Sequence, residues 1–405
     1  MQRSSKRILT THVGSLLKTP AIIDAMRAEA MGESFDRYAF AGDLRKGVSE
    51  VVRKQGEVGI DVPSDGELGK SSWMGYVWER FTGLEPTSEP QSDWFNLRNA
   101  QFRGFQHAYN KIETTAWMPD LPSGKKPENA NIIRFFACTG PVRYRGHAAI
   151  ERDINNFKAA LASTHKFTEA FLPVVAPCSC SFPGMNRHYK TEEEYLFATA
   201  DALHEEYQTV VDAGLLLQVD DAILPMMYIA GAPGQDLQKY RKWAAMCQDA
   251  LNHALRGIPP DRVRYHICWG SQNAPHTWDI PLKEIVDLVL KVNAQAYCIE
   301  AANPRHEHEW RVWETVKLPE GKILIPGVIT HSTNIVEHPE LVAWRIANFA
   351  RLVGRENVMA GTDCGFSQGW NWARVHEEVQ WAKLAALTEG ARLASAQLWG
   401  ASTAS

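Results

Sequence analysis

The most constraining feature of this sequence is the alternation of short apolar segments with longer amphipathic segments in its second half. Short runs rich in Val, Ile and Leu that end at glycine or polar residues are typical of buried parallel strands. We predict such strands at 171–177, 214–219, 263–269, 296–300, 322–329 and 357–362. Helices are predicted between and after them at 192–213, 236–256, 282–291, 306–315, 339–353 and 375–397.

The first part of the chain extends the same alternation. It contains predicted strands at 8–14 and 59–65 and predicted helices at 20–31, 41–58 and 150–168. Eight strands alternating with helices predict an α/β fold of the (β/α)8 TIM barrel type, which needs about 250 residues plus insertions. A doubly wound open sheet is the alternative, but no glycine-rich dinucleotide-binding turn follows the first strand.

Residues 75–150 interrupt the alternation. They are rich in Pro, Trp, Asn and charged residues, with one strand-like run from Ile132 to Cys138 that is followed by Thr139-Gly-Pro141. We interpret this stretch as an insertion after the second strand, containing a hairpin and a helix. The whole chain, 1–405, is then expected to be a single catalytic domain.

Composition narrows the class of protein. The 405 residues are 45% hydrophobic and 22% charged, with a net charge of −4, which gives no electrostatic footprint for nucleic acid or a membrane surface. No apolar run reaches membrane-spanning length, and the N-terminus lacks a signal-peptide core. The seven cysteines are scattered and odd in number, which favours thiols or metal ligands in a cytoplasmic protein over disulfides.

Polar residues of the kinds used in catalysis gather at the carboxyl ends of the predicted strands. In a barrel these ends meet on one face, where catalytic side chains lie. A single acid at such a position is often only the N-cap of the next helix, but capping does not explain seven strand ends that carry polar groups. The residues are Ser15, Asp65, Glu67, Gln218, Asp220, Asp221, His266, Cys268, Glu300, His331, Asp363 and Cys364.

His266 and Cys268 suggest a metal site. They lie two residues apart in a predicted strand, so their side chains point to the same face. An imidazole beside a thiolate suits a soft divalent metal, zinc first, although an isolated pair of this kind is more often a buried histidine and a free cysteine. Cys364 and Glu300, at other strand ends, would complete an N/S/S/O set of zinc ligands.

Such a site suggests chemistry on a thiol. Zinc with a displaceable ligand can hold a substrate thiol as its thiolate, because the metal lowers the pKa of the thiol. The transferred group would come from an electrophile above the metal, and a positioned acid must protonate the leaving atom. His331 is the candidate acid; its alternative role is that of a structural histidine bonded to a loop.

The strand ends resemble those of a known family. The order of Val13-Gly-Ser15, Gln218-Val-Asp-Asp221, His266-x-Cys268, Glu300, His331 and Asp363-Cys-Gly365 is similar to that in the C-terminal barrel of cobalamin-independent methionine synthase. The resemblance covers nearly the whole chain and is closer still to single-barrel proteins named methionine synthase II or epoxyalkane:coenzyme M transferase-like. Its most specific runs are Asp65-Gly-Glu-x-Gly-Lys70, Thr139-Gly-Pro-Val142, Glu300-Ala-Ala-Asn-Pro-Arg-His-Glu-His-Glu-Trp310, Ile325-Pro-Gly-Val328 and Glu389-Gly-Ala-Arg-Leu-Ala-Ser395.

The resemblance implies a TIM barrel of the methionine synthase/uroporphyrinogen decarboxylase type and a zinc-dependent methyl or alkyl transfer to or from a zinc-bound thiolate. Its partners would be a small thiol and an alkyl donor, with a tetrahydrofolate as one possible donor or acceptor, and a homo-oligomer is compatible with it. By this resemblance the zinc ligands are His266, Cys268, Glu300 and Cys364. The catalytic residues are His331, Asp220 and Glu67, and the substrate-binding residues are Ser15, Glu67 and Asp220, to which we add Asp65 and Gln218 from the same strand ends.

One departure from the family concerns the donor. The synthase has a Trp-Ser-Phe-Pro run whose tryptophan stacks on the folate ring, and this sequence has Cys180-Ser-Phe-Pro183 instead. Thiol addition to an epoxide therefore stays open. So does a metal-assisted hydrolase, lyase or demethylase acting on a small aromatic or acidic substrate sheltered by Trp73, Trp269 and Trp278. A non-catalytic zinc or ligand-binding barrel is the third alternative.

Overall fold

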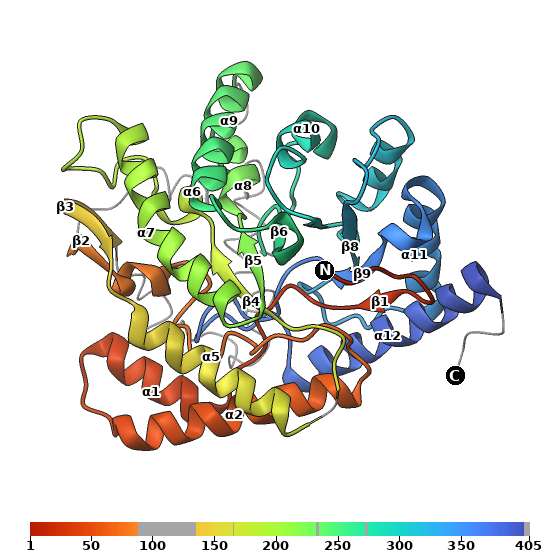
Figure 1. Cartoon of the computed structure of the whole chain (residues 1–405), viewed down its shortest axis with the longest axis horizontal. Coiled ribbons are helices and arrows are strands. Elements are labelled where there is room, and N and C mark those ends of the chain that lie inside the picture. The colour runs from red at the N-terminus through yellow and green to blue at the C-terminus, as the bar shows by residue number, and fades with distance from the viewer. Residues whose placement is uncertain (88–134, 165, 232–234, 272–273, 401–405) are drawn as a thin grey trace.

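The computed structural model describes residues 1–87, 135–164, 166–231, 235–271 and 274–400. At its centre lies a parallel sheet with the strand order β1–β9–β8–β7–β6–β5–β4. Figure 1 shows this sheet in the middle of the molecule with helices around it. The strands are β1 (Leu9–Thr10), β4 (Phe171–Val175), β5 (Leu216–Asp220), β6 (Val263–Ile267), β7 (Ala296–Ile299), β8 (Ile323–Ile329) and β9 (Met359–Thr362).

The segment 61–64 closes the sheet into a ring between β1 and β4. Thr11 forms a parallel bridge with Val62, and the amide of Phe171 in β4 donates to the carbonyl of Pro63 at 3.0 Å. Because Pro63 has no amide hydrogen, it cannot complete a regular ladder. The predicted strand 59–65 is thus an extended segment that fills the eighth position of the ring, and the predicted (β/α)8 barrel is confirmed.

The interior of the barrel is filled by side chains contributed from around the ring. A separate apolar cluster contains residues from nearly every strand position, as expected for a packed barrel core. Its buried members are Leu9, Val62, Phe171, Leu216, Ala296, Cys298, Ile323, Ile325 and Met359. The alternate residues of the same strands, for example Leu217 and Val219, belong to the larger cluster that packs against the helices.

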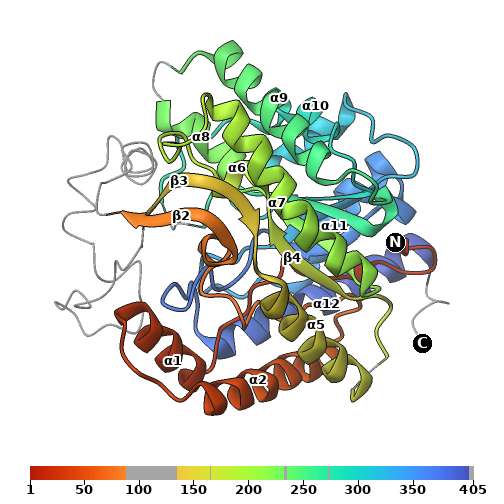
Figure 2. The same cartoon turned by 60° about the vertical axis from the view of Figure 1, so that its left-hand side comes forward.

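The long helices agree with the predicted ones except at their ends. Figures 1 and 2 show them outside the sheet, with α5 and α7 side by side. One helix, predicted at 41–58, begins earlier, at Arg37, because Asp36 caps it. The Asp36 side chain accepts hydrogen bonds from the amides of Tyr38 and Ala39. The helices are α1 (Pro20–Met31), α2 (Arg37–Glu57), α5 (His147–Ala162), α7 (Glu192–Asp212), α9 (Leu237–Ala254), α11 (Pro339–Val353) and α12 (Glu377–Trp399).

The shorter helical elements differ more from the predictions. Two α-helices of the described residues were not predicted, α6 (Pro177–Cys180) and α8 (Ile223–Gly231). The helix α8 is mostly apolar, so its sequence lacks the amphipathic period. The predicted helix 306–315 is a 3₁₀ helix, η4 (Glu307–Glu314), and the predicted helix 282–291 divides into η3 (Leu282–Glu284) and α10 (Val286–Val289). The remaining 3₁₀ turns are η1 (Gly75–Arg80), η2 (Pro260–Arg262) and η5 (Arg355–Asn357).

The segment predicted as an insertion forms a second, antiparallel sheet. β2 (Phe81–Thr87) pairs with β3 (Phe135–Tyr144), and Figure 2 shows this hairpin beside α7. The hairpin is confirmed, although β3 continues through Gly140 and Pro141, where we expected the strand to end. The predicted helix of this insertion lies outside the described residues.

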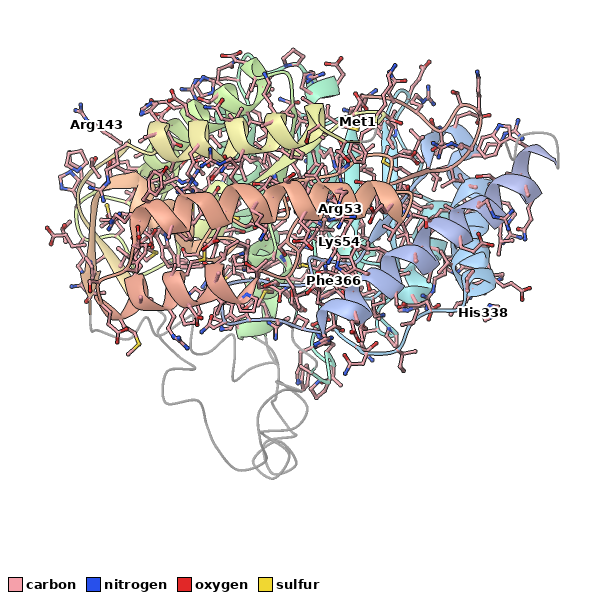
Figure 3. All side chains as sticks on the ribbon, turned by 90° about the horizontal axis from the view of Figure 1, so that it is seen from below. Met1, Arg53, Lys54, Arg143, His338 and Phe366 are labelled. Carbon is pink, nitrogen blue, oxygen red and sulfur yellow. The ribbon has the colours of Figure 1, made fainter. Side chains whose placement is uncertain are left out.

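The helices α2 and α12 contact each other and so close the layer of helices around the sheet. Figure 3 labels Arg53 and Lys54 on α2, and the Lys54 ammonium lies 2.8 Å from the Glu377 carboxylate in the first turn of α12. The Thr388 hydroxyl of α12 also donates to the carbonyl of Val58, just after α2, at 2.7 Å. Among the helices described, none combines the length and the apolar character that crossing a membrane requires.

Candidate metal centre and active site

The predicted site residues lie at the carboxyl ends of the strands. Asp220 is the last residue of β5, and Cys268, Glu300 and Cys364 follow β6, β7 and β9 by one or two positions. Strand register pairs His266 with both Asp220 and Cys298, and Cys298 belongs to the interior cluster. Because paired residues of neighbouring parallel strands face the same side, His266 and Asp220 point into the barrel.

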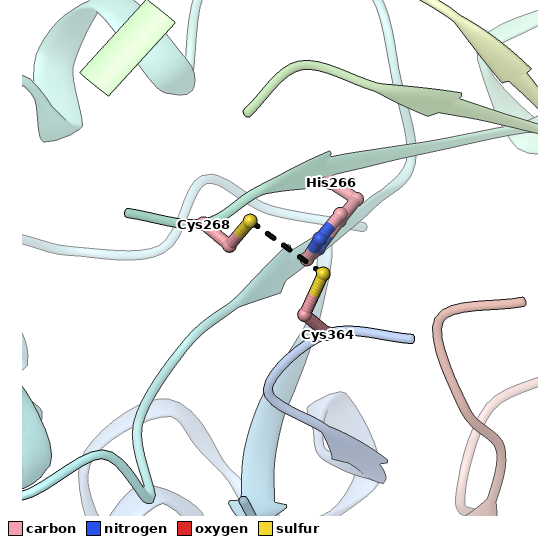
Figure 4. Close-up of side chains that lie close together, drawn as sticks. All are labelled: His266, Cys268 and Cys364. Atoms are coloured by element: carbon pink, nitrogen blue, oxygen red, sulfur yellow. Dashed lines mark hydrogen bonds between the residues drawn. The ribbon is translucent and has the colours of Figure 1, made fainter. Parts of the chain in front are cut away.

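Three of the four predicted metal ligands converge. Ligand atoms of His266, Cys268 and Cys364, here called the thiol–imidazole cluster, all lie within 4.8 Å of one another. The two sulfur atoms are 3.6 Å apart, and Figure 4 shows the three side chains pointing toward one another. The prediction from the His266-x-Cys268 spacing, with Cys364 as a remote partner, agrees with this geometry.

The two cysteines share a proton. Contact with Cys268 lowers the pKa of Cys364 well below its usual value; burial opposes this shift, and the neighbouring His266 and His331 rings add to it. The same contact, together with burial, raises the pKa of Cys268 well above its usual value. The Ser271 hydroxyl also lies 3.4 Å from the Cys364 sulfur. Of the two cysteines, Cys364 is therefore the one that ionises more readily.

The cluster fits a zinc ion. His266 is buried, and neither of its ring nitrogens has a well-formed hydrogen bond to a described residue. A buried polar atom without a partner is costly, and a metal ion would satisfy one of these nitrogens. One imidazole and two sulfur ligands within reach of one ion are the donors that zinc prefers.

Glu300 stands apart from the cluster. Its Oε2 accepts the amide hydrogen of Trp269 at 2.9 Å, and its Oε1 accepts from the Asn303 side chain at 2.9 Å. The group whose ligand atoms converge does not include this carboxylate. Metal ligation by Glu300 therefore stays a prediction.

Three carboxylates predicted to bind substrate are buried beside the cluster. Burial is the main cause that raises the pKa of Asp65 to about 6 and that of Asp220 to about 8. Burial likewise raises the pKa of Glu67, on which the charges of Cys364 and His266 also act. Glu67 has a positive φ of 54°, a strained conformation for a non-glycine residue, and the Asp65 carboxylate holds its amide at 2.9 Å.

Two buried lysines face these acids, and the sequence analysis missed both. Lys18 donates to the carbonyl of Glu67 at 3.0 Å, and burial lowers its pKa to about 8 against the charges of Glu67 and Asp65. Lys70 donates to the carbonyl of Pro173 and lies 4.4 Å from the centre of the Tyr76 ring. Lys70 belongs to the run Asp65-Gly-Glu-x-Gly-Lys70, so a signal existed, whereas Lys18 follows two leucines with no pattern around it.

Gln218 and Ser15 make structural contacts within the site. The Gln218 amide nitrogen donates to the Val13 carbonyl and, at 2.9 Å, to Asp220, which favours a role in orienting Asp220; direct substrate binding by Gln218 stays a prediction. Ser15 packs against Gly365, where an added Cβ atom would lie 1.9 Å from the Ser15 hydroxyl. Gly365 thus allows the segment after Cys364 to approach the first strand end.

His331 lies deep in the site. It is 1% exposed, and neither ring nitrogen has a hydrogen-bond partner among the described residues. Burial is the main cause that lowers its pKa, while the charges of Cys364 and Glu300 oppose the shift. His331 is therefore a buried imidazole on which the charge of Cys364 acts, and the alternative of a histidine bonded to a loop finds no such bond within the described part of the chain.

Other strand-end acids have structural partners. Asp221 accepts hydrogen bonds from Tyr265 at 2.7 Å and from Ser179 at 2.7 Å, which anchors α6 to the sheet. Asp363 accepts the amide hydrogens of Ala301 at 2.7 Å and Ala302 at 2.8 Å. It thereby ties the β7 end to the residue before Cys364.

The aromatic residues proposed as a substrate shelter are only partly placed for that role. Trp269 is 0% exposed, and its indole N–H donates to the Ile280 carbonyl at 2.7 Å, so it is a core residue. The Trp73 amide donates to the Gln368 carbonyl at 3.0 Å and joins two strand-end loops. Cys180 is buried, and its carbonyl accepts from the Trp78 indole at 2.8 Å; this position provides no stacking surface for a ligand.

Comparisons with known proteins agree with the fold. No protein-family model matches the chain. An uncharacterized protein of Bacillus subtilis (strain 168), YxjH, is 25% identical over 393 residues, covering 92% of this chain and 91% of that protein. The methionine synthase of Sulfolobus acidocaldarius is 23% identical over 285 residues, or 70% of this chain and 68% of that enzyme.

A solved structure shows the same fold over the whole chain. It is a B12-independent methionine synthase from Shewanella sp. W3-18-1 in complex with selenomethionine, similar with a TM-score of 0.68 at 18% identity, covering 97% of this chain and 99% of that one. This chain is similar in sequence to proteins named methionine synthase, and it shares its fold with a B12-independent methionine synthase.

Proposed function

We propose that this protein transfers a methyl or alkyl group to or from a small thiol at a zinc ion held by His266, Cys268 and Cys364. The observation that carries the proposal is the convergence of these three ligands within 4.8 Å at the strand ends of the barrel. The activity of relatives named methionine synthase supports methyl transfer to a thiol. Glu300, which follows β7 on the same face, is proposed as a fourth, displaceable ligand.

Residues around the cluster are proposed to bind the thiol substrate. When bound, zinc lowers the pKa of a thiol and so supplies an ionised sulfur nucleophile near neutral pH. Glu67 and Asp220 would hold a cationic group of the thiol substrate, such as an ammonium, because both carboxylates are buried next to the cluster. Asp65 keeps Glu67 in its strained conformation, and the Ser15 hydroxyl, beside the segment that carries Cys364, is a further contact for the same substrate.

His331 is the proposed acid. Neither ring nitrogen is bonded to another described residue, so a proton on the ring is available for transfer. In its protonated form the ring would give this proton to the atom of the donor that becomes negative as its bond to the transferred group breaks. The barrel around it excludes water, since His331 is 1% exposed.

The residue at position 180 affects which alkyl donor the site can accept. A tetrahydrofolate is the donor that the family resemblance implies, but the folate-stacking position is taken by a buried cysteine. This observation favours a smaller electrophile, such as an epoxide or another alkyl donor without a pterin ring. A lyase or demethylase that acts without a thiol is the remaining alternative.

The proposal also covers the organisation of the chain. We propose that residues 1–405 form one catalytic domain, with an insertion at about 75–150, in the single-barrel branch of the family. The partners are a small thiol and an alkyl donor, a homo-oligomer is compatible with the proposal, and the expected location is the reducing cytoplasm, where neighbouring thiols stay reduced.

The test is metal and product analysis of the full-length protein. We expect about one zinc per chain, and X-ray absorption should show one additional sulfur ligand when the correct thiol is added from a set containing homocysteine, glutathione and coenzyme M. Incubation with methyl and epoxide donors should then give a thioether. Turnover without any thiol would point to a lyase or demethylase, and a closed four-ligand site that takes up no sulfur would make the protein a non-catalytic zinc barrel.

Replacing His331 by glutamine should slow transfer without removing the metal. The amide cannot deliver a proton, and general acids contribute about 10²–10⁴-fold. We expect a loss near 10²-fold in kcat, because water can partly replace the acid, with zinc content and thiol binding unchanged. The exposed His188, changed to glutamine, is the control; loss of zinc in the His331 variant would contradict the assigned role.

A further inference from the structure

A cluster of charged side chains beside the metal centre takes no part in the proposed reaction. It consists of His276, Asp279, His306 and Glu309, here called the His306 bracket, whose side chains are 4%, 2%, 3% and 7% exposed. These residues come from the loop after β6 and from the run that starts at Glu300. Buried charged groups need partners, and those of the bracket are arranged around His306.

His306 is held on both sides by carboxylates. Its Nε2 lies 2.9 Å from Asp279 and its Nδ1 lies 2.8 Å from Glu309. A ring that faces a carboxylate at each nitrogen donates from both, and is therefore an imidazolium. Burial alone would lower its pKa, but the bonds to Asp279 and Glu309 raise it to about 10. Glu309 also accepts the amide hydrogen of Leu282 at 2.7 Å, so the ring is fixed to a rigid frame.

The first link from His306 to the metal centre is Trp269, which directly follows Cys268. The indole and the imidazolium stack with their ring centroids 4.1 Å apart and an angle of 24° between their planes. The Trp269 amide donates to Oε2 of Glu300 at 2.9 Å. A shift of His306 would therefore move the donor that holds one oxygen of Glu300.

The second link is Asn303. Its carbonyl accepts the amide hydrogen of His306 at 2.8 Å, and its side chain donates to Oε1 of Glu300 at 2.9 Å. Each oxygen of Glu300 is thus bonded to a residue that itself contacts His306. The plane of the Glu300 carboxylate is set from both sides by neighbours of one imidazolium ring.

We propose that His306, clamped between Asp279 and Glu309, is a positioning residue that orients Glu300 and the Trp269 backbone for metal binding next to Cys268. The inference rests on the proposed function, because it assumes that the thiol–imidazole cluster binds zinc. A carboxylate held in one orientation loses less freedom when it approaches a metal, and groups that hold ligands in this way typically contribute about 10–100-fold to metal affinity.

The test measures metal affinity in the full-length protein with two variants of the bracket. His306→Gln should weaken zinc binding by about 10–100-fold in competition with a chromophoric chelator. It should also change the visible absorption of the cobalt-loaded protein, because those bands depend on ligand geometry. Glu309→Gln removes one charge but keeps an oxygen for the Leu282 amide. We therefore expect a smaller loss of zinc affinity and a smaller change in the cobalt absorption.

Thermal unfolding with and without zinc distinguishes a positioning role of His306 from a purely structural role. A positioning role predicts that the rise in Tm on adding zinc shrinks in both variants, since stabilisation by a ligand follows its affinity. The control, His253→Gln, breaks a more exposed pair between His253 of α9 and Asp201 of α7 (His253 Nε2 to Asp201 Oδ1, 2.7 Å) and should leave the zinc-dependent rise unchanged.

The outcomes separate the two proposals. If the unaltered protein binds zinc and the variants match its affinity, cobalt spectrum and zinc-dependent rise in Tm, His306 has no positioning role. If the unaltered protein binds no zinc at the cluster, the proposed function fails, and this inference fails with it. If His306→Gln does not fold, Glu309→Gln decides.

Discussion

Replacing Cys364 by alanine is expected to remove the metal and the activity together. Cys364 has the lowered pKa of the cysteine pair, and it lies at a different strand end from His266 and Cys268. Four-ligand zinc sites bind with about 10–16 kcal/mol, so one ligand corresponds to roughly 3–4 kcal/mol, or about 10²–10³-fold in affinity. Zinc per chain should fall from about one to near zero after dialysis, and thioether formation should become undetectable.

The matched control for Cys364 is another buried cysteine. Cys247 lies in α9 and is 2% exposed, but it is not among the converging metal ligands. Cys247→Ala should keep about one zinc per chain and nearly full activity. A Cys364→Ala protein that retains stoichiometric zinc and unchanged turnover would refute the metal centre. Circular dichroism spectra of the two proteins show whether a loss of zinc comes from unfolding and not from the missing ligand.

Replacing Arg80 by methionine is expected to cost the most stability of any single change considered. Arg80 is buried and donates to Glu206 at 2.9 Å and to Asp153 at 2.8 Å, and its guanidinium lies 4.7 Å from the centre of the Tyr76 ring. It joins η1 to α5 and α7. Methionine has a similar shape but leaves the buried Glu206 without its cation and Asp153 with Arg152 alone, a loss of about 3–5 kcal/mol.

The measurement is the free energy of unfolding from guanidinium titration. The control is Arg392→Met, which breaks an exposed pair with Glu389 within α12 and should leave the midpoint unchanged, because exposed ion pairs contribute little. An Arg80→Met protein as stable as the unaltered one would show that Asp153 and Glu206 take up protons or water at no cost. In that case the two ion pairs of Arg80 would not stabilise the contact of η1 with α5 and α7.

The sequence predicted the barrel because its strands are buried on both faces. Such strands appear as continuous apolar runs, and the long helices between them show an amphipathic period. Elements without a regular hydrophobic period were missed or assigned wrongly. The helix α8 is mostly apolar, η4 is a 3₁₀ helix inside a charged run, and the segment 61–64 completes the ring although Pro63 prevents a regular ladder.

The candidate site was predicted in part. The cluster of His266, Cys268 and Cys364 followed from their residue types and from the rule that strand ends converge. The contacts of Glu300 with Trp269 and Asn303 did not follow, and neither did the burial of Lys18 and Lys70. A carboxylate or an ammonium has the same sequence signature whether it faces a substrate, a metal or a backbone carbonyl.

The sequence by itself determined the class of fold, the face of the barrel that carries chemistry and the kinds of ligand available there. These depend on local periodicity, on the two-residue repeat of a strand and on residue types. Only the tertiary structure decided which groups meet. Cys268 and Cys364 are 96 positions apart in the chain, and the distance between their sulfur atoms depends on how every intervening strand and helix packs around the ring.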